Sequence, residues 1–93
     1  MYSQGDILLV PLPFTGLSSQ KRRPVLVLSK DDYNNVVDDL IVAAITFYID
    51  SKPYNVLLSN NDMADGTLKV DSCIRADKIY TLFQSISEKL NLK

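Results

Sequence analysis

The chain has 93 residues, 46% of them hydrophobic and 23% charged, which is typical of a folded globular protein and excludes a disordered one. Ten basic and eleven acidic residues give a formal net charge of -1, which excludes proteins that coat nucleic acid through bulk positive charge. Any contact with nucleic acid must therefore be made by a local group of residues. The length predicts a single domain, residues 1–93, whose small core gains stability from a partner subunit.

The single cysteine, Cys73, cannot form an internal disulfide. The sequence shows no N-terminal signal pattern and no apolar run near the roughly 18 residues that a membrane-spanning helix needs. These features favour a reducing cytoplasm and no membrane attachment. We expect Cys73 to be a small apolar core residue rather than a nucleophile, because the chain has no histidine to activate it.

Two strands are predicted in the first third of the chain. Residues 6–11 form a short apolar segment that ends at Pro11, because proline cannot donate to a strand ladder. After a loop, residues 24–29 form a continuous apolar run that predicts a central strand covered on both faces, with Pro24 at its first position. Residues 30–39 are polar and predict a loop or a single helical turn.

The rest of the chain predicts further short strands at residues 40–47, 55–58 and 70–80. The last of these can bend, and its alternation predicts one shared face for Val70, Ser72, Ile74, Ala76 and Lys78. Residues 82–93 fit both a helix and a strand, and we favour a short strand after a single turn. Short strands without a long helical pattern predict a mainly β fold, either a small antiparallel barrel or a half-open sheet.

Four sequence blocks occur together in a characteristic order. They are Gly5-Asp-Ile-Leu-Leu-Val-Pro11, Lys21-Arg-Arg-Pro-Val-Leu-Val-Leu-Ser29, Val42-Ala-Ala-Ile-Thr46 and Asp71-Ser-Cys-Ile-Arg-Ala-Asp77. With these blocks the chain resembles the MazF/PemK family of toxins over nearly its whole length. The Arg-Pro-Val-Leu-Val block combined with the Ala-Ile-Thr block is more specific than either block alone.

The resemblance implies an SH3-like antiparallel barrel with short helical turns, acting as a homodimer in the cytoplasm. It also implies a growth-inhibiting toxin that cleaves single-stranded mRNA at short motifs without a metal or cofactor, leaving 2',3'-cyclic phosphate and 5'-hydroxyl ends. A cognate antitoxin would be its protein partner, in a complex that binds DNA. Family members usually continue into a C-terminal helix, and we expect that helix to be missing or shortened here.

The resemblance also implies which residues form the site. Arg23 and Thr46 would line the cleavage site, joined by Arg75 and Asp77 as in some family members. We expect Lys21 and Arg22 to contact the RNA backbone, and Phe47 to stack on a base. The acidic pairs Asp31-Asp32 and Asp38-Asp39 have no metal-ligand spacing, so no metal site is expected.

The chemistry agrees with these residue types. RNA cleavage by its own 2'-hydroxyl requires proton removal, stabilisation of a dianionic phosphorane and help for the departing 5'-oxygen. Arginine is a poor proton carrier, because its pKa exceeds about 12, but its planar fork matches phosphate oxygens. We therefore expect Arg23 to clamp the transition state and Thr46 to donate to a nonbridging oxygen. The four site residues should converge within about 6–8 Å.

Asp77 could act as a general base if burial raises its pKa, whereas Arg75 on the same strand face would lower that pKa, and the sequence does not decide between the two effects. Each candidate also has an ordinary structural explanation. The basic triplet can be solvated surface, Thr46 can be a strand former, and Arg75 and Asp77 can be a surface ion pair. The alternative function is a barrel that binds a protein or RNA without cleaving it.

Overall fold

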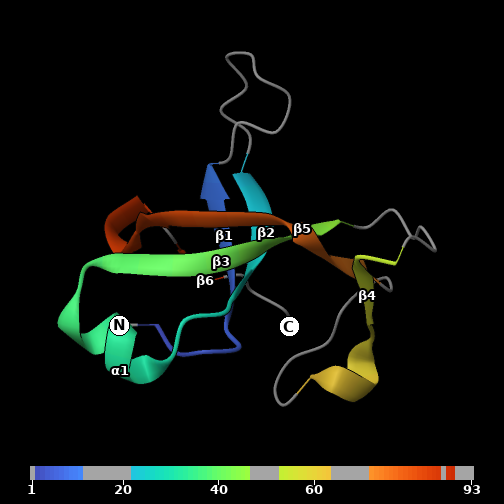
Figure 1. Ribbon diagram of the computed structural model, residues 1–93, viewed down its shortest axis with the longest axis horizontal. Helices are drawn as coiled ribbons and strands as arrows, with labels where there is room; N and C mark the ends of the chain where they lie inside the picture. The colour runs from blue at the N-terminus through green and yellow to red at the C-terminus, as the bar shows by residue number, and fades with distance from the viewer. Residues whose placement is uncertain (1, 12–21, 47–52, 64–71, 87, 90–93) are drawn as a thin grey trace.

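The computed structural model describes residues 2–11, 22–46, 53–63, 72–86 and 88–89, which form one six-stranded antiparallel sheet (Figure 1). The strands are β1 Ile7–Pro11, β2 Arg22–Val27, β3 Asp39–Thr46, β4 Asn55–Leu58, β5 Ser72–Phe83 and β6 Glu88–Lys89. The helical elements of this part of the chain are α1 Asp31–Val36 and the short 3-10 turns η1 Asn60–Asp62 and η2 Gln84–Ile86. The fold is therefore mainly β, as predicted.

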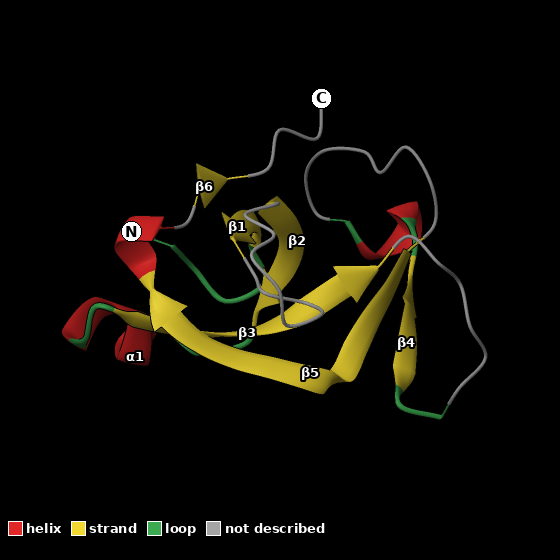
Figure 2. Ribbon diagram, turned by 90° about the horizontal axis from the view of Figure 1, so that it is seen from above, coloured by secondary structure: helices red, strands yellow, loops and turns green. Residues whose placement is uncertain are grey.

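The sheet has the order β4-β5-β3-β2-β1-β6. Figure 2 shows that it is strongly curved: β5 bends, and β4 lies beside the end of β5 beyond that bend. Within the described ranges, β4 and β6 form the two edges and do not pair with each other. Of the two predicted forms, a small SH3-like barrel and a half-open sheet, the described residues therefore take the half-open one, in which the curvature comes from twist and a bulge rather than from closure.

Most element predictions are confirmed with small shifts. The strand at Asn55–Leu58 has the predicted bounds, and the C-terminal segment forms the turn η2 followed by β6. The polar segment after the second strand forms the short helix α1, which is the predicted single turn extended slightly. The second strand begins at Arg22 rather than Pro24, and its pairing with β3 begins only at Val25, beside the proline that has no N–H for that ladder.

Apolar side chains pack on both faces of the central strands. One cluster contains Leu8, Val10, Val25, Val27, Leu40, Val42 and Leu82. The other contains Ile7, Ile45 and Leu58, with Leu26, Met63 and Ile74 packed against it. Strand β2 therefore contributes to both clusters, which confirms that it is covered on both faces. Cys73 is 2% exposed and lies in the core, as expected for a small apolar residue.

Strand β5 carries a large bulge that changes the predicted alternation. Ala44 of β3 pairs with Arg75, whereas the adjacent Ala43 pairs with Ile79, so three residues of β5 have no partner position on β3. The bend is confirmed, but the single face predicted for Ser72 to Lys78 is wrong: Ser72 and Cys73 are both buried, and Ala76 is exposed. The extra residues interrupt the two-residue period that the prediction assumed. Val70 lies outside the described residues.

Candidate active site

The register of β2 and β3, extended two residues beyond their paired positions, would make Arg23 and Thr46 neighbours. Arg23 pairs with Val10 of β1, and two residues further along β2 Val25 pairs with Ala44 of β3. Continuing the same register by two residues sets Arg23 opposite Thr46 at the end of β3. Cα atoms of directly opposite residues lie about 4.5–5.5 Å apart. Both side chains are half-buried, and the Nε atom of Arg23 is shielded from solvent.

Arg75 belongs to the same face of the sheet. It pairs with Ala44, while Thr46 pairs with Cys73 two residues earlier in β5. Paired residues and residues two apart share a face, so Arg23, Thr46 and Arg75 continue the face that carries Val25 and Ala44. Val25 and Ala44 are both fully buried. The apolar face therefore ends in two arginines and a threonine, which is a surface suited to an anion.

Arg75 and Asp77 are joined directly. Nε of Arg75 donates to Oδ1 of Asp77 at 3.0 Å, and Nη2 donates to Oδ2 at 2.7 Å. This hydrogen bonding from Arg75 outweighs desolvation and lowers the pKa of Asp77 below its ordinary value. Of the two opposing effects on this pKa, burial and the contact with Arg75, the contact with Arg75 is therefore the stronger. Asp77 is held ionised and is a weak base at neutral pH.

Tyr54 lies next to Arg75 and was not predicted from the sequence as a site residue. The Cζ atom of Arg75 lies 5.7 Å from the centroid of its ring, within the range of a cation–π contact. The carbonyl oxygen of Tyr54 also accepts a hydrogen bond from the Ala76 N–H at 3.0 Å. Tyr54 precedes β4, and no spacing rule connects it to Arg75. Only the pairing of Asn55 with Arg75 brings the two together.

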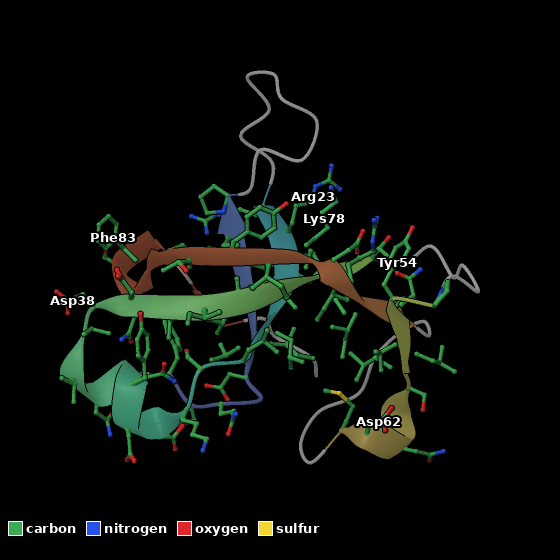
Figure 3. All side chains as sticks on the ribbon, in the orientation of Figure 1. Arg23, Asp38, Tyr54, Asp62, Lys78 and Phe83 are labelled. Carbon is green, nitrogen blue, oxygen red and sulfur yellow. The ribbon has the colours of Figure 1, made fainter. Side chains whose placement is uncertain are left out.

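Lys78 was also not predicted from the sequence as a site residue. It is half-buried at the end of the bulge, and its charge contributes to the lowered pKa of Asp77. In the view of Figure 3, Arg23 and Lys78 lie on the same side of the ribbon, and Tyr54 lies further along β5. Asp38 and Phe83 lie at the opposite end of the sheet in that view. Basic residues thus gather toward the end of β5 that carries the bulge.

The predicted RNA-contacting residues are only partly described. Lys21 and Phe47 lie outside the described residues. Arg22 is exposed and pairs with Pro11, and strand alternation puts it on the opposite face of β2 from Arg23. Arg22 and Arg23 therefore cannot approach one phosphate from the same side of the strand. The expected convergence of all four central residues stays a prediction. Strand pairing puts Thr46 and Arg75 on one face, and Arg75 contacts Asp77 directly.

Among the described residues, no three Cys, Asp or Glu side chains are grouped as metal ligands. Likewise, no helix in those ranges is long and apolar enough to cross a membrane.

The fold of the chain is similar to that of solved MazF structures. A solved MazE-MazF structure from Deinococcus radiodurans is similar to the chain, with 28% identity, a TM-score of 0.68, and coverage of 98% of this chain and 78% of that one. MazF from the same organism is similar at 26% identity, with a TM-score of 0.69 and coverage of 98% and 80%. A comparison with curated protein sequences gives no match.

The sequence pattern of one family matches residues 3–90. The chain belongs to this family, the PemK-like, MazF-like toxins of type II toxin-antitoxin systems.

Proposed function

We propose that this toxin is a metal-independent endoribonuclease that cleaves single-stranded mRNA at specific sequences. The observation that supports the proposal is the pairing of β3 with β2 and β5, which puts Thr46 and Arg75 on one face and, extended by two residues, would bring Arg23 opposite Thr46. Two guanidinium groups and a hydroxyl at one end of an otherwise apolar face match the oxygens of a phosphodiester. Family membership supports the same activity.

In the proposed reaction, the ribose 2'-oxygen attacks the adjacent phosphorus and the bond from phosphorus to the 5'-oxygen breaks. Arg23 clamps the two nonbridging oxygens, and Thr46 donates its hydroxyl hydrogen to one of them, so that both act on charge that develops in the phosphorane. Arg75 adds positive charge at the same phosphate. The proton of the 2'-hydroxyl passes to solvent, and the departing 5'-oxygen takes a proton from solvent.

Asp77 has a supporting role in this scheme. Its lowered pKa makes it a poor acceptor of the 2'-hydroxyl proton at neutral pH, but its two-point contact helps to orient the Arg75 guanidinium. Lys21 and Arg22 would contact neighbouring phosphates, and Phe47 would stack on a base. No cofactor takes part.

The proposed partners follow from the family and from the edge of the sheet. The similar Deinococcus structure is a MazE-MazF complex, and we assign this chain a cognate antitoxin in the same way, in a complex that binds DNA. We also assign it a homodimeric state and a cytoplasmic location, where mRNA is available. Val56 and Leu57 on edge strand β4 are 53% and 58% exposed, which provides apolar surface for such contacts.

The test is incubation of the purified chain with a mixed-sequence RNA in EDTA, followed by analysis of the fragment ends. The proposal predicts 2',3'-cyclic phosphate and 5'-hydroxyl ends from the unchanged protein. Arg23→Ala should abolish these fragments, whereas Lys30→Ala, which removes an exposed cation before α1, should not. Cleavage that requires added magnesium would contradict the proposal. Binding of RNA without cleavage would favour the non-catalytic alternative.

A further inference from the structure

The side chain of Arg75 is bounded on two sides. In the plane of the guanidinium, Asp77 accepts hydrogen bonds from Nε and Nη2 at 3.0 and 2.7 Å. On a second side, the Cζ atom lies over the ring of Tyr54, 5.7 Å from the ring centroid. The two contacts differ in kind, because the carboxylate accepts directed hydrogen bonds whereas the ring face attracts the positive charge of the guanidinium.

Tyr54 also holds the backbone next to Arg75. The three residues after Arg75 bulge away from β3 and have no partner position on that strand. The N–H of the first of these, Ala76, donates to the Tyr54 carbonyl oxygen at 3.0 Å. Asn55, the residue after Tyr54, pairs with Arg75 itself. Tyr54 and Asn55, at the start of β4, therefore hold both the backbone and the guanidinium of Arg75 where the bulge begins.

We propose that Tyr54 is a positioning residue of the nuclease site, which holds the Arg75 guanidinium in the orientation that meets the RNA phosphate. This inference rests on the proposed function for its effect on catalysis, but the contact itself can be tested without RNA. The ion pair with Asp77 alone would hold Arg75 weakly, because water competes for both groups. The side chains of Arg75 and Asp77 are 28% and 32% exposed. The cation–π contact with the Tyr54 ring supplies the second restraint.

The experiment compares Tyr54→Ala and Tyr54→Leu, which remove the aromatic face, with Tyr54→Phe, which keeps it. Tyr33→Ala is the matched control, because Tyr33 on α1 has the same exposed fraction as Tyr54, 37%, and lies at the far side of the molecule from β4 (Figure 1). Tyr54→Leu keeps apolar bulk before β4 in case the alanine variant does not fold. The readouts are the pKa of the Asp77 carboxyl by NMR titration and the separate values of kcat and KM for RNA cleavage.

Loss of the ring should loosen the bond between Arg75 and Asp77 and raise the pKa of Asp77 toward its ordinary value. KM should rise about threefold, the effect of losing one exposed cation–π contact. Tyr54→Phe and Tyr33→Ala should change neither quantity. An unchanged Asp77 pKa in a folded Tyr54→Leu variant would overturn the inference. If the unchanged protein cleaves no RNA, the proposed function fails, and the NMR titration still decides whether Tyr54 positions Arg75.

Discussion

Arg75 and Asp77 face each other across a single intervening residue and share two hydrogen bonds, Nε to Oδ1 at 3.0 Å and Nη2 to Oδ2 at 2.7 Å. These hydrogen bonds keep the two side chains together although Asp77 lies within the bulge that begins after Arg75. The pair keeps the carboxylate ionised and the guanidinium oriented. Its effects are therefore expected in pH dependence as well as in cleavage.

The first prediction concerns acid. Asp77 has a pKa lowered below 3.8, chiefly by hydrogen bonding to Arg75. Its contribution to stability is fully present above 3.8 and is lost as the pH falls through the lower, folded-state pKa. In Asp77→Asn this acid-dependent part of the unfolding free energy should disappear, as measured by urea unfolding between pH 2 and 6. Parallel pH profiles for the two proteins would contradict the assignment.

Arg23→Lys should separate phosphate geometry from charge. Lysine keeps the positive charge but cannot present the planar fork that grips two oxygens, so kcat should fall about 100-fold with little change in KM. Arg22→Ala removes a cation from the opposite face of β2, so its effect should be mainly on KM. Single-turnover cleavage of a defined RNA measures both. Equal kinetic effects of the two substitutions would show that Arg23 has no special place in the site.

Thr46→Val should reduce kcat about 100-fold, because it removes the hydroxyl that donates to the phosphorane while keeping the β-branched shape. The midpoint of thermal unfolding should stay nearly unchanged, since valine is also a good strand former. Thr46→Ser retains the hydroxyl and should recover most of the activity. A Thr46→Val enzyme with normal kcat would remove Thr46 from the reaction.

Asn34 makes a prediction about stability rather than catalysis. It is 1% exposed, and its Nδ2 donates to the carbonyl oxygens of Ser29 at 3.0 Å and Tyr2 at 3.3 Å. Asn34→Ala would leave these acceptors buried without their donor, so we expect a loss of about 1–3 kcal/mol in the free energy of unfolding. Asn35→Ala, at the next and exposed position of α1, should change it by less than about 0.5 kcal/mol. Similar urea midpoints for both variants would contradict this role of Asn34.

The strands were predictable because each is a short apolar run bounded by proline or polar residues, as at Asn55–Leu58 after Pro53. The alternation of β5 was not predictable, because the bulge after Arg75 depends on how β5 meets β3 and not on its own sequence. The same limit explains the omission of Tyr54. Its contact with Arg75 joins strands that pair only in the folded sheet.

The candidate site, too, was predictable from the sequence only in part. Arg75 and Asp77 could be paired from sequence, because a two-residue spacing on a strand puts both on one face. Whether the pKa of Asp77 is raised or lowered could not be predicted, because burial and the Arg75 hydrogen bond act in opposite directions. Only the geometry shows which effect is stronger. The neighbouring positions of Arg23 and Thr46 follow from the register of β2 and β3, for which the sequence alone offered only the family resemblance.

The central claim is that Arg23 and Thr46 act on the same phosphate, and a double-mutant cycle measures this most directly. The cycle compares kcat/KM for RNA cleavage by the unchanged protein, Arg23→Lys, Thr46→Val and the double variant. If both side chains stabilise one phosphorane, the double variant should be at least about threefold more active than the product of the single effects predicts. Effects that multiply independently would contradict a shared site.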